Sequence, residues 1–93
     1  MKKTLERTAL IYGKETLEAL ENKKVMVVGL GGVGGYVVEA LTRMGIGHFI
    51  LIDHDVVSES NINRQLIATY QTIGQKKIDV MKERMLTIQP EAV

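Results

Sequence analysis

An apolar run that leads directly into a cluster of glycines constrains this chain more than any other feature. Residues 25–28 are apolar and mostly β-branched, and five glycines fall within residues 29–35. This order is typical of a buried strand, a tight turn, and a helix whose first turn carries few side chains. The backbone N–H groups of such a turn lie at the positive end of the helix dipole, where a phosphate can approach them. The stretch therefore predicts a nucleotide site.

Length and composition exclude several classes of protein. The chain has 93 residues, which suffice for one small domain, residues 1–93. A net charge of +1 gives no global field that would attract nucleic acid or an anionic membrane. The absence of cysteine excludes disulfides, thiolate zinc sites and a cysteine nucleophile. Apolar runs such as residues 49–52 are far shorter than the roughly 20 residues that span a bilayer, so we expect a cytoplasmic protein without a membrane partner.

The spacing of apolar residues predicts alternating helices and strands. The expected helices are residues 4–20, broken at Gly13, then three turns from Val33, and four turns from Gln75 to Pro90. A short helical turn is expected at residues 62–68. The methionines of the last helix recur at helical spacing, which favours a place in the core. The expected strands are residues 25–28 and 49–52.

The order of these elements indicates an α/β fold built on a Rossmann-like parallel sheet. Residues 49–52 are apolar on both sides of the pleat, which predicts a sheet covered on both faces. Two parallel strands do not make a stable sheet alone. We therefore expect an N-terminal part, two strands flanked by helices, which a third strand completes. Residues 91–93 resemble the approach to that strand, whether it comes from the remainder of the protein or from a partner.

The glycines also match a dinucleotide-binding pattern. Gly29, Gly31 and Gly34 satisfy G-x-G-x-x-G, and Asp53 follows 19 residues after Gly34, at the end of the second strand. Glycines permit close approach to phosphates, and the carboxylate accepts hydrogen bonds from ribose hydroxyls. Dehydrogenases, methyltransferases and adenylating enzymes all use this pattern. The alternative is that the glycines serve only helix–strand packing.

Three further features favour a triphosphate over a hydride carrier. Gly32 removes one more Cβ than the dinucleotide pattern requires, and a polar run occupies residues 60–65. In that run Arg64 offers a planar fork to phosphate oxygens, and Asn61 can hold a phosphate without adding charge. Lys77, near the start of the last helix, adds a second cation that suits a polyphosphate under attack.

Each of these cations has a structural alternative. Arg64 could form an ion pair with Asp55 or Glu59, and Lys77 could belong to a solvated helix face. Arg7 could likewise be a solvated helix charge.

Five segments occur in the order and spacing of the ThiF/MoeB/HesA family, the ubiquitin-activating-enzyme-like adenylating proteins. They span nearly the whole chain, and the Asn-x-x-Arg-Gln element is highly specific. Within the family the sequence most resembles the tRNA threonylcarbamoyladenosine dehydratase branch. The segments are residues 7–13 (RTALIYG), 29–34 (GLGGVG), 51–55 (LIDHD), 60–65 (SNINRQ) and 74–77 (GQKK).

The resemblance implies an ATP site and a homodimer. Asp53 would bind the ribose, Asp55 would shape the pocket, and Arg7 would reach into the partner subunit's site. Catalytic roles fall to Arg64, Lys77 and Arg7. No metal ligand is expected within the chain, and the aspartate that holds Mg²⁺ is expected beyond Val93. The implied ATP-binding residues are Gly29, Gly31, Gly32, Gly34, Asp53, Asp55, Ser60, Asn61, Arg64 and Lys77.

The implied reaction is attack of a carboxylate on the α-phosphorus of ATP, with release of pyrophosphate. In the dehydratase branch the carboxylate belongs to a threonylcarbamoyl group on tRNA adenosine. Three alternatives stay open: activation of a sulfur-carrier protein for thiamin or molybdopterin synthesis, a dinucleotide-dependent oxidoreductase, and a non-catalytic nucleotide-binding or dimerisation module. We expect the full-length protein to be an enzyme and residues 1–93 alone to have little or no adenylation activity.

Overall fold

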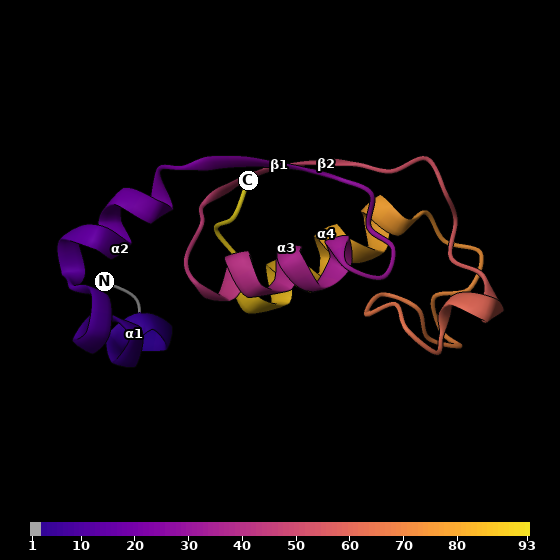
Figure 1. Cartoon of the computed structure of the whole chain (residues 1–93), viewed down its shortest axis with the longest axis horizontal. Coiled ribbons are helices and arrows are strands. Elements are labelled where there is room, and N and C mark those ends of the chain that lie inside the picture. Colours follow the sequence, from indigo (N-terminus) through magenta and orange to yellow (C-terminus); the bar gives the residue numbers. More distant parts are fainter. Residues whose placement is uncertain (1–2) are drawn as a thin grey trace.

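The computed structural model describes residues 3–93 as two parallel strands with helices before, between and after them (Figure 1). Gly13, with a φ of +85°, separates the first two α-helices, as the sequence predicted. Both strands begin one residue earlier than expected. In chain order the elements are the 3-10 helix η1 (Lys3–Leu5), α1 (Glu6–Tyr12), α2 (Lys14–Glu21), β1 (Lys24–Val28), α3 (Gly34–Arg43), β2 (His48–Ile52), the 3-10 helix η2 (Glu59–Asn61) and α4 (Lys77–Ile88).

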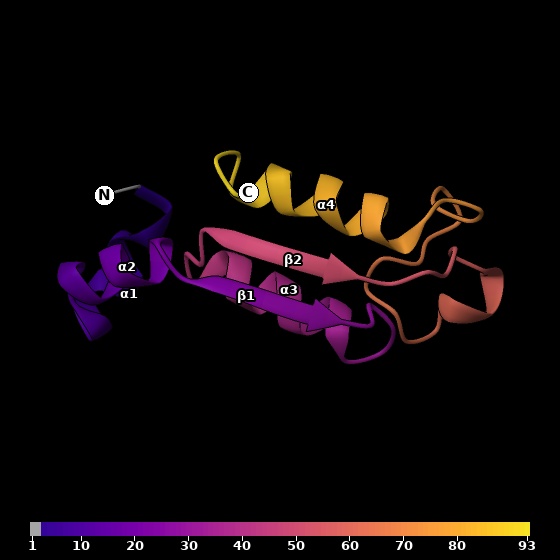
Figure 2. The ribbon, with the colours of Figure 1, turned by 90° about the horizontal axis from the view of Figure 1, so that it is seen from above.

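The parallel pairing of β1 with β2 places the ends of both strands at the same edge of the sheet. The register runs from Lys24 opposite His48 to Val28 opposite Ile52. Figure 2 shows both arrows pointing the same way, with α3 as the crossover between them. A parallel pair needs such a crossover because the chain must return to the other end before it starts the second strand.

The turn between β1 and α3 depends on two glycines. Gly29 adopts a φ of +87°, and its N–H donates to the carbonyl of Ile52 at 2.7 Å. A Cβ on Gly34 would lie 1.7 Å from the carbonyl oxygen of Gly29, which no side chain could tolerate. These two glycines therefore serve the strand–turn–helix packing.

The core lies between the sheet and the two long helices. Met81 and Met85 of α4 are buried, as their spacing predicted, and they pack with Val38 of α3. Leu30, in the glycine turn, is fully buried in the same cluster. The turn is thus anchored in the core by an apolar side chain between its glycines.

The opposite face of the sheet is bare, so the prediction of a sheet covered on both faces is wrong for residues 3–93. Both α3 and α4 lie on one face (Figure 1). On the other face four apolar side chains are substantially exposed: Met26, Val28, Ile50 and Ile52. Both faces of the sheet are apolar, as the sequence predicted. The helix after β1 and the helix after β2 both pack on the same face, so the other face is left uncovered by residues 3–93.

The edge of β2 that faces away from β1 forms hydrogen bonds with Val93 at the start of the strand. Val93 donates its N–H to the carbonyl of Gly47 at 3.0 Å and accepts from the N–H of Phe49 at 2.8 Å. These two bonds are the pattern of a parallel bridge. Beside this edge lies an apolar groove of about 530 Å³, lined in part by Phe49, Met85 and Leu86. Residues 91–93 thus do lead toward a third strand position next to β2.

Two local predictions need correction. The short helical turn expected at residues 62–68 is found earlier, as η2, because Ser58 and Asn61 form a capping box around it. The last helix begins at Lys77 and not at Gln75, because Lys76 is extended and pairs with Val56 as an isolated antiparallel bridge. None of the helices in the described part of the chain has the length and apolar character needed to cross a bilayer.

Two substitutions distinguish a glycine that the fold requires from one that it does not require. Gly34→Ala should lower the free energy of unfolding by about 3 kcal/mol or more, because the added Cβ clashes with the backbone of Gly29. This value is at the upper end of the usual destabilisation by an overpacked side chain. Gly32→Ala should change it by less than about 0.5 kcal/mol, because nothing lies within 4 Å of the added Cβ. Urea unfolding of both variants checks this. Equal stability of the two variants would contradict it.

Candidate functional site

The polar residues singled out in the sequence gather at the carboxyl ends of the two strands. The glycine turn follows β1 directly, and Asp53 follows β2. In Figure 2 these segments lie at the arrowheads, far from α1 and α2. In open α/β sheets, ligands bind in the crevice outside this edge.

Asp53 joins the two strand ends. Its Oδ2 accepts from the N–H of Leu30 at 2.7 Å, and its Oδ1 accepts from the N–H of Asp55 at 2.8 Å. A carboxylate offers about four lone-pair positions, so each oxygen keeps one for a ligand. The side chain is held in one orientation and can still accept from hydroxyl groups.

The surroundings of Asp53 keep it ionised. Burial raises the pKa of this carboxyl, but the N–H donors of Leu30 and Asp55 and the nearby Lys77 and His54 outweigh that effect. The pKa of Asp53 therefore lies below its ordinary value of 3.8. Carboxylates stabilised in this way are strong hydrogen-bond acceptors at neutral pH.

Lys77 is buried beside Asp55, so the alternative of a solvated helix face is wrong. Its side chain is only 7% exposed, and its Nζ lies 3.9 Å from Oδ2 of Asp55, which is 57% exposed. The backbone N–H of Lys77 also donates to the carbonyl of Asp55 at 3.1 Å. His54, almost fully exposed, places Nε2 3.4 Å from the other oxygen of Asp55. The first residue of α4 is thus tied to the segment that follows β2.

Asn61 is held by the loop that it caps. Its Oδ1 accepts from the N–H of Ser58 at 2.9 Å and from the hydroxyl of Ser58 at 3.1 Å, and the residue is buried. Because the amide oxygen is engaged, the amide nitrogen is the group left to donate. Ser60 is exposed, and its hydroxyl lies 3.1 Å from that of Ser58.

Arg64 is exposed and keeps most of its donors. Its Nη1 donates to the carbonyl of Ser60 at 3.0 Å and to Oδ1 of Asn63 at 2.9 Å. Among residues 3–93 it forms no ion pair with Asp55 or Glu59, so that alternative is wrong. Both contacts use one terminal nitrogen, which leaves a planar guanidinium able to bind an anion.

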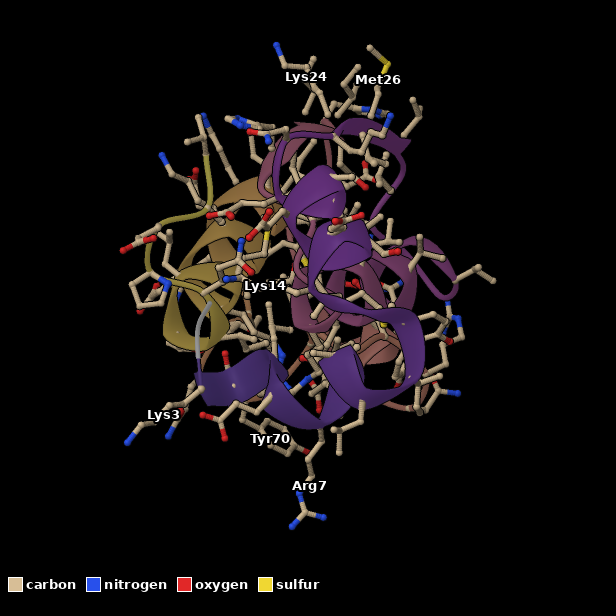
Figure 3. All side chains as sticks on the ribbon, turned by 90° about the vertical axis from the view of Figure 1, so that its left-hand side faces the viewer. Lys3, Arg7, Lys14, Lys24, Met26 and Tyr70 are labelled. Atoms are coloured by element: carbon tan, nitrogen blue, oxygen red, sulfur yellow. The ribbon has the colours of Figure 1, made fainter. Side chains whose placement is uncertain are left out.

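Arg7 is not part of this cluster within one chain. It lies in α1, at the opposite end of a molecule about 41 Å long, and its side chain projects away from the body (Figure 3). The alternative of a solvated helix charge describes its state in the single chain.

Two groups at the carboxyl ends of the strands were not among the predicted site residues. The N–H of Leu30 orients Asp53, but a backbone donor leaves no signal in a sequence. Gln65 is buried against Gly31, with Nε2 3.4 Å from the position that a Cβ there would occupy. Its place in the polar run beside Arg64 was the available signal. Across the described ranges, no group of three or more His, Cys, Asp or Glu side chains is arranged to hold a metal ion.

The sequence and fold of the chain are similar to those of known proteins. The sequence model of the ThiF family matches residues 5–93. The chain belongs to the ThiF family. Its residues 29–35, 53–55, 58–65 and 77 lie at or near the carboxyl ends of the two strands of this ThiF domain.

The similar proteins include tRNA-modifying enzymes. The chain is 51% identical over 85 residues to the tRNA threonylcarbamoyladenosine dehydratase of Bacillus subtilis (strain 168), covering 91% of this chain and 34% of that protein. It matches the crystal structure of E. coli tRNA N6-threonylcarbamoyladenosine dehydratase, TcdA, with a TM-score of 0.94 and 42% identity, over 97% of this chain and 38% of that one. A structure of that protein in complex with ATP matches equally well, over 97% and 37%. The chain spans about a third of the length of these relatives.

The lowered pKa of Asp53 makes the stability of the ThiF domain pH-dependent. Around pH 3.8 the unfolded carboxyl binds a proton while the folded one stays ionised, so the unfolded state binds more protons and stability rises with pH. The contribution is complete above this range and is lost as pH falls through the lower, folded pKa.

Asp53→Asn should therefore cost about 1–3 kcal/mol at pH 7, because the amide cannot accept from both N–H donors. The variant should also lose less stability than the wild type between pH 5 and pH 3. Urea unfolding across that range measures both effects, with the exposed Asp79→Asn as the control. Parallel pH profiles for wild type and Asp53→Asn would contradict the assignment.

Proposed function

We propose that this chain is the N-terminal ATP-binding part of an enzyme that adenylates a carboxylate. The observation that supports this most directly is the assembly of the glycine turn, Asp53, Arg64 and Lys77 at one edge of the sheet. The likeness to a structure in complex with ATP adds independent support.

The geometry suggests a role for each group. Gly31 and Gly32 would lie under the phosphates, beside the free N–H groups at the start of α3, and Asp53 would accept from the ribose hydroxyls. Arg64 and the amide nitrogen of Asn61 would bind phosphate oxygens. Lys77 would offset charge near the α- and β-phosphates, held there by Asp55. Gly29 and Gly34 would contribute by shaping the turn, and Ser60 by its place beside Arg64.

The reaction would be the attack of a carboxylate oxygen on the α-phosphorus. The bond from that phosphorus to the bridging oxygen breaks, and pyrophosphate leaves with the bond's electron pair. The resulting acyl-adenylate has a good leaving group, AMP. In the tRNA-modifying relatives' case, attack by a nucleophile within the same threonylcarbamoyl group would close a ring and expel AMP.

Mg²⁺ is the usual companion of ATP phosphates and is bound through one or two carboxylates. The described residues do not provide a dedicated site, because Asp53 accepts two backbone N–H groups and Asp55 is paired with Lys77. An aspartate beyond Val93 as the ligand of the ion stays a prediction.

We propose tRNA as the acceptor, in a cytoplasmic homodimer whose partner subunit supplies Arg7. The similarity to tRNA threonylcarbamoyladenosine dehydratases supports the acceptor, and the distance of Arg7 from its own site supports its use across subunits. A sulfur-carrier protein is the second candidate. The molybdopterin-synthase adenylyltransferase of Salmonella typhimurium (strain LT2) is 40% identical over 76 residues, covering 82% of this chain and 30% of that protein.

Binding of ATP should stabilise the full-length gene product, and NAD should not. A ligand at 100 times its Kd stabilises a protein by about 2.7 kcal/mol, which raises the thermal midpoint by several degrees. Thermal unfolding with ATP and Mg²⁺, with NAD, and without ligand measures the difference. Stabilisation by NAD alone would favour the oxidoreductase alternative and overturn the proposal.

Arg64→Ala should weaken ATP binding by about 1.5–3 kcal/mol, the value of a hydrogen bond to a charged group, which is roughly 10- to 150-fold in Kd. Arg43→Ala is the matched control, because Arg43 is an exposed arginine at the opposite end of α3. The affinity of Arg43→Ala for ATP should equal that of the wild type. Titration calorimetry with ATP compares the three proteins. An unchanged affinity for Arg64→Ala would leave Arg64 with only its contacts to Ser60 and Asn63.

A further inference from the structure

Gln65 has a buried side-chain amide whose oxygen lacks a hydrogen-bond donor in the described part of the chain. The residue is 8% exposed, and its backbone N–H donates to the carbonyl of Asn61 at 2.9 Å. Its Oε1 is enclosed and has no hydrogen-bond partner among residues 3–93, a property that no other buried side-chain oxygen or nitrogen in that range shares. An enclosed acceptor without a donor lowers stability, because it has lost its water and gained nothing.

The same amide lies directly against the glycine turn. Its Nε2 lies 3.4 Å from the position that a Cβ on Gly31 would occupy, and its Cδ lies 3.9 Å from it. Gly31 does not have a positive φ, so its backbone conformation alone does not demand glycine. At these distances the amide would be in ordinary van der Waals contact with a Cβ at position 31, so the fold does not require glycine there. The NH₂ group of Gln65 therefore borders the turn at the start of α3.

An apolar side chain of the same length would fill this space without an unpaired oxygen. Methionine has nearly the volume of glutamine and tolerates irregular packing. The amide is therefore not needed for packing and lowers the stability of the unliganded protein. Its NH₂ group, in contrast, suits an anion that lies on the turn, because it donates without adding charge beside Arg64 and Lys77.

We propose that Gln65 is a further nucleotide-binding residue, whose Nε2 donates to a phosphate oxygen of ATP at Gly31 and Gly32. This inference rests on the proposed function and deepens it, because it assigns the contact to the phosphates and not to the nucleoside. The unliganded protein is less stable for carrying the amide, and the bound nucleotide gains a neutral donor.

The test compares Gln65→Met with Gln89→Met in the full-length gene product. Gln89 is the matched control, because it is equally buried at 6% exposure, but its Nε2 donates to the carbonyl of Ile46 at 3.1 Å, at the end of the chain's core away from the glycine turn. Gln65→Met should keep or raise the thermal midpoint without ligand and raise the Kd for ATP about tenfold. Gln89→Met should lower the thermal midpoint and leave the Kd unchanged.

Gln65→Glu adds a readout that a purely structural role would not move. The carboxylate repels the phosphates, and burial raises the pKa of such a group. ATP affinity of Gln65→Glu should therefore recover as pH falls, when the protonated carboxyl can donate, while that of Gln65→Met stays low. Adenosine, which lacks phosphates, should bind all of these proteins with the same affinity.

The outcomes separate the inference from the proposed function. Failure of the wild type to bind ATP refutes both. ATP binding by the wild type, with equal affinity in Gln65→Met, refutes the inference alone. A thermal midpoint of Gln65→Met as low as that of Gln89→Met, or an equal loss of adenosine affinity, also overturns it, because Gln65 would then support the pocket as a whole.

Discussion

The hydrogen bond from the N–H of Leu30 to Asp53 is the interaction on which the site depends. It connects the turn after β1 to the end of β2, which only the parallel register brings together. The side chain of Leu30 is fully buried, so its N–H is fixed by the core and not by the loop. The core thereby sets the orientation of a carboxylate at the surface. The N–H of Asp55 also donates to Asp53, and this bond fixes the backbone of Asp55, whose side chain pairs with Lys77.

The glycines of the turn divide into two groups with different physical reasons. Gly29 and Gly34 are required by the backbone, one for its positive φ and the other for its contact with Gly29. Gly32 meets no neighbour, and Gly31 meets only the amide of Gln65. A glycine that the fold does not require leaves space for something outside the chain. The shared motif in the sequence therefore contains both structural and ligand-facing positions.

Local pattern was enough to predict β1, α3, β2 and α4. It also singled out polar residues that lie near the carboxyl ends of the two strands, such as Asp53 and Lys77, and their roles in binding stay a prediction. Apolar periodicity and glycine position are properties of neighbouring residues, and the structure confirmed them within one or two residues. Features that depend on distant segments were not predictable in this way. The burial of Lys77 arises because Lys76 pairs with Val56, and the bare face of the sheet arises because both long helices follow the strands on one side. Neither arrangement leaves a periodic signal.

The charges at the strand ends indicate what the site still needs. Asp53 and Asp55 carry two negative charges, and Arg64 and Lys77 carry two positive ones, so the cluster is close to neutral. A triphosphate adds several negative charges in a partly buried place, where an uncompensated charge is costly. Neutral donors such as Asn61 bind phosphate oxygens but do not offset the negative charge of the triphosphate. We infer that further positive charge must come from outside this cluster. Arg7 of a partner subunit and Mg²⁺ are the two sources that we propose, and the side chain of Arg7 points away from its own chain.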